Sequence, residues 1–192
     1  MPSMDFLQTT ASYLSLQEQK ELEIALEEEP THGLFLRQDR INAEDFLSLF
    51  PNVQRHPIVK NGFLYHKDEY EFGKHALFDL GAYYIQDPAA MVVASLLPNI
   101  DNGYILDMCA APGGKSIGYA LNHPTATILS NDISYPRAKE LSRNVERMGL
   151  GNIAVTCGDF ASSHTHYPEY FDAIILDAPC SGFGDVSEKR GR

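Results

Sequence analysis

A glycine turn between a short apolar run and a helix-like segment constrains the fold of this chain more than any other feature. The run Tyr104-Ile105-Leu106 leads into Asp107-Met-Cys-Ala-Ala-Pro-Gly-Gly-Lys-Ser116, and a segment with helical character follows. A strand, a tight glycine turn and a helix start form ligand sites in parallel α/β sheets. The adjacent Gly113 and Gly114 lack Cβ atoms and let backbone N–H groups approach a ligand closely. The turn therefore predicts an α/β fold with a nucleotide-like ligand.

Two well-known glycine loops do not match this turn. A P-loop requires G-x-x-x-x-G-K-[ST]; Gly114-Lys115-Ser116 fits its end, but its first glycine would fall on Cys109. A dinucleotide turn requires G-x-G-x-x-G, whereas the glycines here are adjacent. A kinase or other nucleotide-dependent enzyme remains an alternative, and Cys109 argues against it.

Three later segments repeat the pattern of a short apolar run followed by an acid. Such runs suit strands that are buried on both faces of a parallel sheet. Open α/β sheets bind ligands at the carboxyl ends of their strands, so we expect the acids along that edge. Asp132 follows Gly114 at close to the ~20 residues at which such folds place a ribose-binding carboxylate. The segments are Thr127–Asp132, Asn152–Thr156 and Phe171–Asp177, and the acids are Asp107, Asp132, Asp159 and Asp177.

The residues before this sheet predict a separate layer of helices and strands. Apolar residues recur at helical spacing from Asp5 to Glu29, and Pro30 ends that helix. Asn42 is expected to cap a second helix, which Pro51 stops. The remaining expected elements are strands at Leu34–Leu36 and Phe63–Tyr65 and an apolar helix over Ala89–Leu97 that Asp87 caps.

Length and composition indicate one or two globular domains. The 192 residues are 44% hydrophobic and include three cysteines, an odd number that indicates reduced thiols. No apolar run reaches the ~18 residues of a membrane span. We expect a cytoplasmic monomer that binds no metal.

The motifs D-M-C-A-A-P-G-G-K-S and D-A-P-C-S-G at this spacing are highly specific. They resemble those of the Sun (Nop2-like) family of RNA cytosine-C5 methyltransferases, and most of all its bacterial small-subunit rRNA methyltransferase F type. The resemblance covers residues 60–184 and includes the segment Gly81–Met91. It implies S-adenosylmethionine as cofactor and RNA as partner, with rRNA favoured and tRNA left open. It also implies that residues 1–80 form a small α+β domain that recognises RNA, and that residues 81–192 form a Rossmann-like α/β domain whose sheet lacks its final strands.

The resemblance implies a role for each motif position. Asp132 would accept hydrogen bonds from the ribose hydroxyls, Asp159 would lie by the adenine amine, and Asp177 would lie near the methionine amine and the target base. The ammonium and sulfonium of the cofactor are cationic, so a pocket rimmed by carboxylates suits it better than a triphosphate. The methionine and ribose would be wrapped by Cys109, Ala110, Ala111, Pro112, Gly113, Gly114 and Lys115.

The cysteines depart from the family pattern. Cytosine C5 is weakly nucleophilic, and a thiolate that adds to C6 of an unstacked base activates it. The family's assisting cysteine, in a Pro-Cys motif, matches Cys180, whereas its nucleophile lies in a later Thr-Cys motif. Thr156-Cys157 precedes the Pro-Cys motif and takes no role by resemblance. We therefore expect a truncated or frameshifted product whose main nucleophile lies beyond Arg192.

A non-catalytic RNA-binding or ribosome-assembly protein that retains the cofactor fold is the second alternative. The missing Thr-Cys motif favours it. A net charge of −11 is unexpected for an RNA-binding chain, because phosphate contacts prefer a basic face. A basic cluster on one expected helix is either an RNA-facing patch or a solvated helix face; its members are Arg137, Lys139, Arg143 and Arg147.

Overall fold

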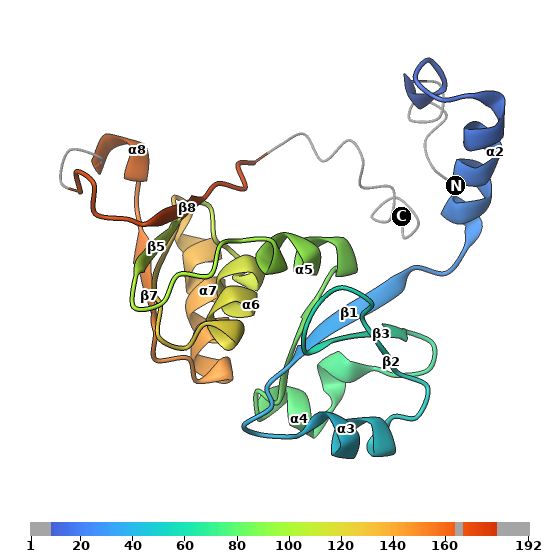
Figure 1. Ribbon diagram of the computed structural model, residues 1–192, viewed down its shortest axis with the longest axis horizontal. Helices are drawn as coiled ribbons and strands as arrows, with labels where there is room; N and C mark the ends of the chain where they lie inside the picture. The colour runs from blue at the N-terminus through green and yellow to red at the C-terminus, as the bar shows by residue number, and fades with distance from the viewer. Residues whose placement is uncertain (1–8, 164–166, 180–192) are drawn as a thin grey trace. The chain divides into compact units, whose positions relative to one another are not determined.

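The computed structural model describes residues 9–163 and 167–179, which fall into two compact units (Figure 1). One unit contains the described residues 9–30 together with Pro179, and the other contains Thr31–Ala178. Both β-sheets of the described chain lie in this second unit. None of the helices in the described residues is long and apolar enough to cross a lipid bilayer.

Helix α2 (Leu16–Glu27) dominates the first unit. The Ser15 side chain accepts a hydrogen bond from the Glu18 N–H, and the Glu18 carboxylate accepts one from the Ser15 N–H. This reciprocal capping box fixes the start of the helix. A short helical turn over residues 9–11 precedes it. The single helix predicted over Asp5–Glu29 is therefore wrong in its first part, because the Ser15 cap starts a new helix.

The second unit begins with an antiparallel sheet, whose described strands are ordered β2–β3–β1–β4. Strand β1 (Thr31–Leu36) pairs with β3 (Gly62–His66) and with β4 (Tyr83–Gln86), while the short β2 (Gln54–Arg55) pairs with β3. Both strands predicted in this region are confirmed. Because β4 lies after residue 80, the first sheet draws strands from both sides of the expected domain boundary.

Aromatic side chains fill the core of this first sheet. Helix α3 (Ala43–Leu49) begins where predicted, because the Asn42 side chain accepts a hydrogen bond from the Asp45 N–H at 2.9 Å. The 3-10 helix η1 (Phe72–Lys74) and α4 (Ala76–Asp79) complete the layer. The rings that pack against one another include Phe46, Phe63, Phe72 and Tyr83.

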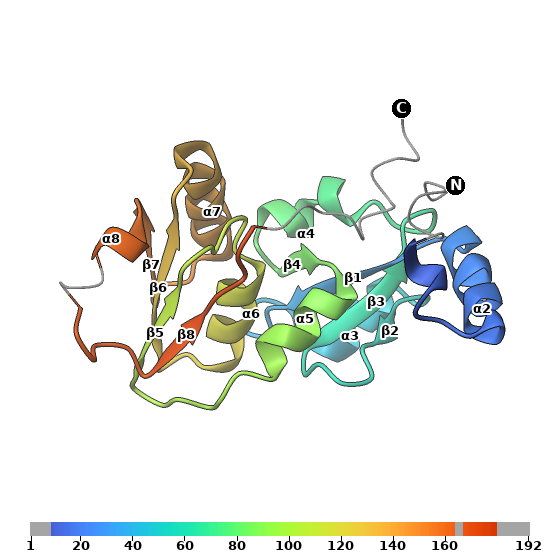
Figure 2. The same ribbon diagram turned by 90° about the horizontal axis from the view of Figure 1, so that it is seen from above.

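The second sheet is parallel, and its described strands are ordered β7–β6–β5–β8. Helices α6 (Gly114–Asn122) and α7 (Tyr135–Met148) lie on the same face of it (Figure 2). The chain runs outward from the central β5 and then returns to β8 on the other side, which makes a topological switch point. The predicted Rossmann-like class is confirmed. The remaining elements are β5 (Tyr104–Asp107), β6 (Thr127–Asp132), β7 (Ile153–Cys157), α8 (Phe160–Ser163) and β8 (Ala173–Ile175).

Helix α5 (Pro88–Ser95) and one arginine join the two sheets. As predicted, the Asp87 side chain caps α5, accepting from the Ala90 N–H at 3.0 Å. Arg147 of α7 donates to the backbone carbonyls of Phe78 and Tyr83, and its guanidinium lies 3.8 Å from the Phe78 ring centroid. These contacts fix the first sheet against α7. Helix α7 follows β6, the strand that ends at the predicted site residue Asp132.

Candidate functional site

The four predicted acids lie along one edge of the second sheet. Asp107 and Asp132 are the last residues of β5 and β6, whereas Asp159 and Asp177 follow β7 and β8. The strand order therefore places them in the sequence Asp159, Asp132, Asp107, Asp177 along the edge. Asp107 and Asp132 are 0% and 1% exposed, and the other two are exposed to solvent. The edge thus combines two buried and two exposed carboxylates.

The two glycines of the turn have different roles. Gly113 has a φ of 115°, in the region that side chains rarely adopt, and a Cβ there would lie 2.9 Å from Leu141 Cδ1. Gly114 begins α6, and a Cβ on it would overlap the carboxamide of Gln86. The first glycine shapes the turn, and the second lets β4 approach it.

Asp107 ends a chain of buried hydroxyl groups beneath the turn. Ser116 Oγ donates to Asp107 Oδ2 at 2.7 Å, and Ser130 Oγ donates to Ser116 Oγ at 2.7 Å. Asp107 Oδ1 is buried without a hydrogen-bond partner in the described chain; the Cys109 N–H approaches the carboxylate without hydrogen-bond geometry. Burial raises the pKa of Asp107 to about 6, against the lowering effects of Ser116 and Lys115.

Asp132 also keeps an oxygen able to accept a hydrogen bond. Its Oδ1 accepts from the Ser134 N–H at 2.9 Å. Arg137 Nη1 lies 3.3 Å from Oδ2, which makes an ion pair but not a hydrogen bond, so Oδ2 has no hydrogen-bond partner among the described residues. A ligand that brings hydroxyl groups to this edge would supply the missing donor.

A pocket of ≈ 270 Å³ lies between the glycine turn and β4. At this pocket Lys115 Nζ lies 2.5 Å from Asp177 Oδ2, and the lysine side chain is only 18% exposed. The pocket is therefore walled by both sheets and has an ion pair in its lining. Its polar lining residues are Tyr84, Gln86, Asp87, Asp107, Cys109, Lys115 and Asp177.

The thiols that can be described do not provide a thiolate in this pocket. Burial, followed by the charges of Asp132 and Asp107, raises the pKa of Cys109. Its thiol therefore stays protonated at neutral pH and forms a neutral part of the wall. Cys157 is exposed at the end of β7. Cys180, the predicted assisting cysteine, lies outside the described residues.

Side chains from two other elements hold the carbonyls of the turn. Arg137 donates to the Ala111 carbonyl at 2.5 Å, and Asn144 donates to the Pro112 carbonyl at 2.9 Å. The Tyr84 hydroxyl reaches the same Pro112 carbonyl at 3.4 Å, and burial raises its pKa to about 12, so it stays a donor. The turn is thus positioned by α7 and by β4.

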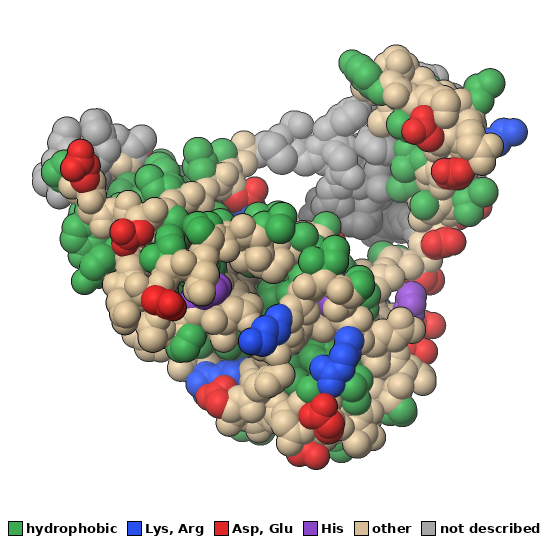
Figure 3. Space-filling view, in the orientation of Figure 1, with side chains coloured by type: hydrophobic (Ala, Val, Ile, Leu, Met, Phe, Trp, Pro, Cys, Tyr) green, Lys and Arg blue, Asp and Glu red, His purple; other side chains and the backbone are tan. Residues whose placement is uncertain are grey.

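The basic cluster expected on α7 is divided in the structure. Arg137 binds the turn and Asp132, and Arg147 binds the first sheet, whereas Lys139 and Arg143 are exposed. On the face seen in Figure 3, Lys and Arg side chains are scattered and lie near acidic ones. Two of the four basic residues, Arg137 and Arg147, therefore bind other parts of the protein.

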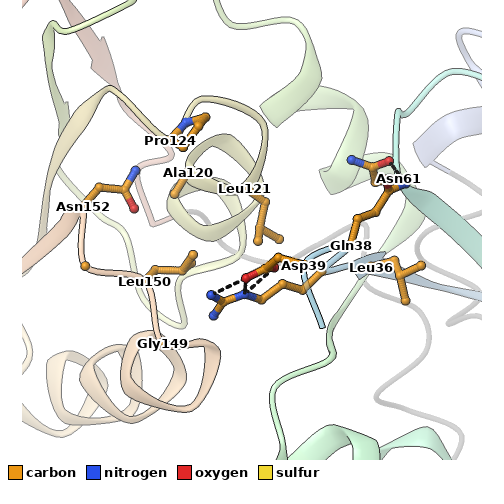
Figure 4. A pocket seen from close by; sticks show the side chains of 12 residues that line it. Leu36, Gln38, Asp39, Asn61, Ala120, Leu121, Pro124, Gly149, Leu150 and Asn152 are labelled. Carbon is orange, nitrogen blue, oxygen red and sulfur yellow. Dashed lines mark hydrogen bonds and ion pairs between the residues drawn. The ribbon is translucent and has the colours of Figure 1, made fainter. Parts of the chain in front are cut away.

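A larger hollow of ≈ 630 Å³ lies at the opposite end of the second sheet, where the loops enter β6 and β7 (Figure 4). Its polar side chains bind one another: Arg37 pairs with Asp39 at 2.8 Å, and Gln38 donates to Asn61 at 2.6 Å. Asn152 donates to two backbone carbonyls. Nη1 of Arg37 is buried without a partner in the described residues, but Asp39 balances its charge. None of the four acids lines this hollow.

Two family models match this chain. The model of the 16S rRNA methyltransferase RsmB/F matches residues 94–191, half of the chain, and that of the N-terminal domain of 16S rRNA methyltransferase RsmF matches residues 2–88. The chain belongs to the RsmB/F family of 16S rRNA methyltransferases. The family consists of S-adenosylmethionine-dependent methyltransferases, and the resemblance found in the sequence is confirmed.

Relatives of this RsmB/F-family chain include two proteins named as ribosomal RNA methyltransferases. Ribosomal RNA small subunit methyltransferase F of Salmonella paratyphi C is 37% identical over 157 residues, which cover 77% of this chain and 33% of the relative. The protein of the same description from Pectobacterium atrosepticum is 46% identical over 110 residues, 55% of this chain and 22% of the relative. This chain therefore spans a third or less of the length of these relatives.

The RsmB/F fold is also seen in a solved structure. A crystal structure of a methyltransferase homolog protein from Pyrococcus horikoshii matches with a TM-score of 0.72 at 22% identity. The match covers 97% of this chain and 68% of the other. At this identity, the likeness supports the fold.

Sequence patterns did not identify several residues at the carboxyl edge of the second sheet. Asn131 is 3% exposed and donates to the carbonyls of Met108 and Gly158, which ties the loops after β5 and β7 to β6. Ser130 and Asn131 are polar residues within an apolar strand, a signal that was available. Gln86 gave no such signal, because only the fold brings β4 beside the turn.

Proposed function

We propose that this chain binds S-adenosylmethionine at the carboxyl edge of its parallel sheet, for methyl transfer to C5 of a cytosine in rRNA. The observation that carries the proposal is the pair of buried acceptors, Asp107 Oδ1 and Asp132 Oδ2, beside a glycine turn at the switch point. Buried acceptors without a hydrogen-bond partner are unusual in native proteins, and a ligand, an ion or an ordered water accounts for them.

The residues at this edge fit the proposed cofactor. Asp132 Oδ2 would accept from the ribose hydroxyls, and Asp159 would lie by the adenine. Asp177, paired with Lys115, would lie near the methionine end and the target base, while residues 109–115 wrap the methionine and ribose. Carboxylates suit a ligand that carries a sulfonium and an ammonium.

The bound cofactor supplies an electrophilic methyl group. Addition of a thiolate to cytosine C6 would make C5 nucleophilic, and loss of the C5 proton and of the thiolate would restore the ring. The raised pKa of Cys109 does not suit it for this role. We propose an assisting role for Cys180.

We propose that residues 1–80, whose sheet is completed by β4, recognise RNA, and that the cytosine is single-stranded or flipped from its stack. The resemblance of the N-terminal region to the RsmF domain supports this proposal. An rRNA substrate would place the protein in the cytoplasm.

Calorimetry with S-adenosylmethionine tests the proposed site. The wild-type chain is expected to bind, and Asp132→Ala is expected to weaken binding about 10- to 100-fold, because two hydroxyl hydrogen bonds to a carboxylate are lost. Asp68→Ala, which removes an exposed acid in the turn after β3, is the matched control and is expected to have no effect. ATP is expected not to compete. Absence of wild-type binding, or an Asp132→Ala variant that binds normally, would overturn the assignment.

The base and atom are tested by product analysis. The chain is incubated with 16S rRNA and isotopically labelled S-adenosylmethionine, and the nucleosides are separated by mass spectrometry. Label in 5-methylcytidine supports the proposed chemistry. Label in a different nucleoside contradicts the choice of C5, and cofactor binding without transfer favours a binding or assembly role.

A further inference from the structure

Strand β4 brings a carboxamide from the first sheet into the pocket of the second. Gln86 is the last residue of β4 and pairs with Gly33 of β1. Its side chain occupies the space that a Cβ on Gly114 would need, so it lies directly on the glycine turn. The Oε1 atom of Gln86 is buried and has no hydrogen-bond partner within the described chain.

The same pocket contains a second buried acceptor that has no hydrogen-bond partner in the described chain. Asp107 is fully buried, and its Oδ1 has no hydrogen-bond partner in the part of the chain that the structure describes. Gln86 and Asp107 both line the pocket of ≈ 270 Å³, although they come from different sheets. Two unpaired acceptors in one pocket indicate a ligand group with several hydrogen-bond donors.

The charges around the pocket select the kind of donor group. Three of its lining residues are acids, Asp87, Asp107 and Asp177, and one is a lysine, Lys115, which pairs with Asp177. Asp87 is the cap of α5 and accepts from the Ala90 N–H. A carboxylate has no donor and would be repelled, and a hydroxyl has one donor. An ammonium has three donors and a compensating charge.

We propose that Gln86 Oε1 and Asp107 Oδ1 together bind the α-ammonium group of the methyl donor's amino-acid part. This inference rests on the proposed function, since it takes S-adenosylmethionine as the ligand. It makes Gln86, a residue of the first sheet, a cofactor-binding residue. Recognition of the cofactor then depends on the docking of β4 against α6 as well as on the motif residues.

Two ligands that differ at one group test this inference. Binding of S-adenosylhomocysteine is compared by calorimetry with binding of its analogue in which hydrogen replaces the α-ammonium. The wild-type chain is expected to prefer S-adenosylhomocysteine by about 30-fold, as for hydrogen bonds to a charged group. Gln86→Leu is expected to reduce that preference about tenfold while leaving the affinity for the analogue within twofold.

Further variants separate recognition from folding. Gln86→Glu keeps an acceptor and adds charge, so it is expected to retain or increase the preference for the ammonium. Gln38→Leu, which removes a glutamine at the opposite hollow, is the matched control and is expected to change neither affinity. Equal loss of both ligands in Gln86→Leu, or a reduced preference in Gln86→Glu, would overturn the inference. If wild type binds neither ligand, the proposed function itself fails.

Discussion

At the carboxyl end of the second sheet, Asp107 and Asp132 each keep a buried oxygen without a hydrogen-bond partner in the described chain. At the opposite end of the same sheet, the polar side chains around the hollow of Figure 4 mostly bind one another, as in the pairs Arg37–Asp39 and Gln38–Asn61. The opposite hollow is the larger of the two, ≈ 630 Å³ against ≈ 270 Å³.

Hydrogen-bonding state therefore identifies a binding site better than the volume of a hollow does. A buried acceptor without a partner reduces stability, so a fold retains it where a ligand supplies the donor. At the opposite hollow the buried Arg37 Nη1 has no partner among the described residues, but the other nitrogens of its guanidinium already donate to Asp39. Changes at the carboxyl end should therefore affect cofactor binding, and changes at the opposite end should not.

The largest effect is expected from Gly113→Ala. The φ of 115° is strained for alanine, and its Cβ would press on Leu141, so we expect a loss of about 2–4 kcal/mol in unfolding free energy. The turn would move, and affinity for S-adenosylhomocysteine should fall about 100-fold through lost hydrogen bonds. Denaturant unfolding and calorimetry measure both.

The matched control for this change is Gly151→Ala. Gly151 lies at the opposite hollow, and nothing stands within 4 Å of the Cβ that alanine would add. We expect normal stability and normal affinity. If both glycine variants bind the cofactor equally well, the turn does not shape the site.

A smaller effect is expected from Ser116→Ala, which breaks the buried chain beneath the turn. It leaves Asp107 Oδ2 without its donor, so unfolding free energy should fall by about 1–3 kcal/mol. The pKa of Asp107 should rise further, because the Ser116 hydrogen bond lowers it. Ser142→Ala, on the surface of α7, is the comparison variant. Equal stability of the two variants in denaturant titrations would contradict a buried network.

Cofactor binding should depend on pH through Asp107. Its pKa is raised to about 6 by burial, so the unliganded carboxyl keeps its proton to a higher pH than in the unfolded chain. The α-ammonium group of the ligand binds the ionised form. Affinity for S-adenosylhomocysteine should therefore rise about tenfold from pH 5 to pH 7 and level off above pH 7. Without ligand, this group's contribution to stability is present at low pH and lost as the pH rises through 6.

Two variants check the origin of this profile. Asp107→Asn cannot titrate, so it should remove the pH dependence of the cofactor affinity. Asp177 raises the pKa of Asp107 and Lys115 lowers it, so Asp177→Asn should move the midpoint to lower pH. Calorimetry across the pH range measures both, and a profile that Asp107→Asn leaves unchanged would assign the dependence to a different group.

The smallest effect is expected from Asp39→Asn at the opposite hollow. The Arg37–Asp39 pair has an exposed aspartate, with 64% of its side chain accessible, so unfolding free energy should change by about 0–1 kcal/mol. Cofactor affinity should stay the same. A drop in affinity would show that the two ends of the sheet are coupled, and the comparison between them would fail.

Much of the fold follows from local sequence patterns. The apolar run Thr127–Asp132 is strand β6, and Asn42 and Asp87 cap helices as expected. The helix predicted from Asp5 was too long, because periodicity reports an apolar spacing but not the break that the Ser15 cap introduces. Strand β4 was not predicted, since the short run Tyr83–Gln86 is defined by its pairing with β1.

The glycine turn, the acids at the strand ends and the family could be predicted from the sequence, because they depend on residue types at fixed spacing along the chain. The fold was needed to show which acids are buried, which of their oxygens lack a hydrogen-bond partner in the described chain, and that Gln86 lies on the turn. Burial and hydrogen bonding depend on neighbours from distant segments. A spacing pattern along one segment cannot specify them.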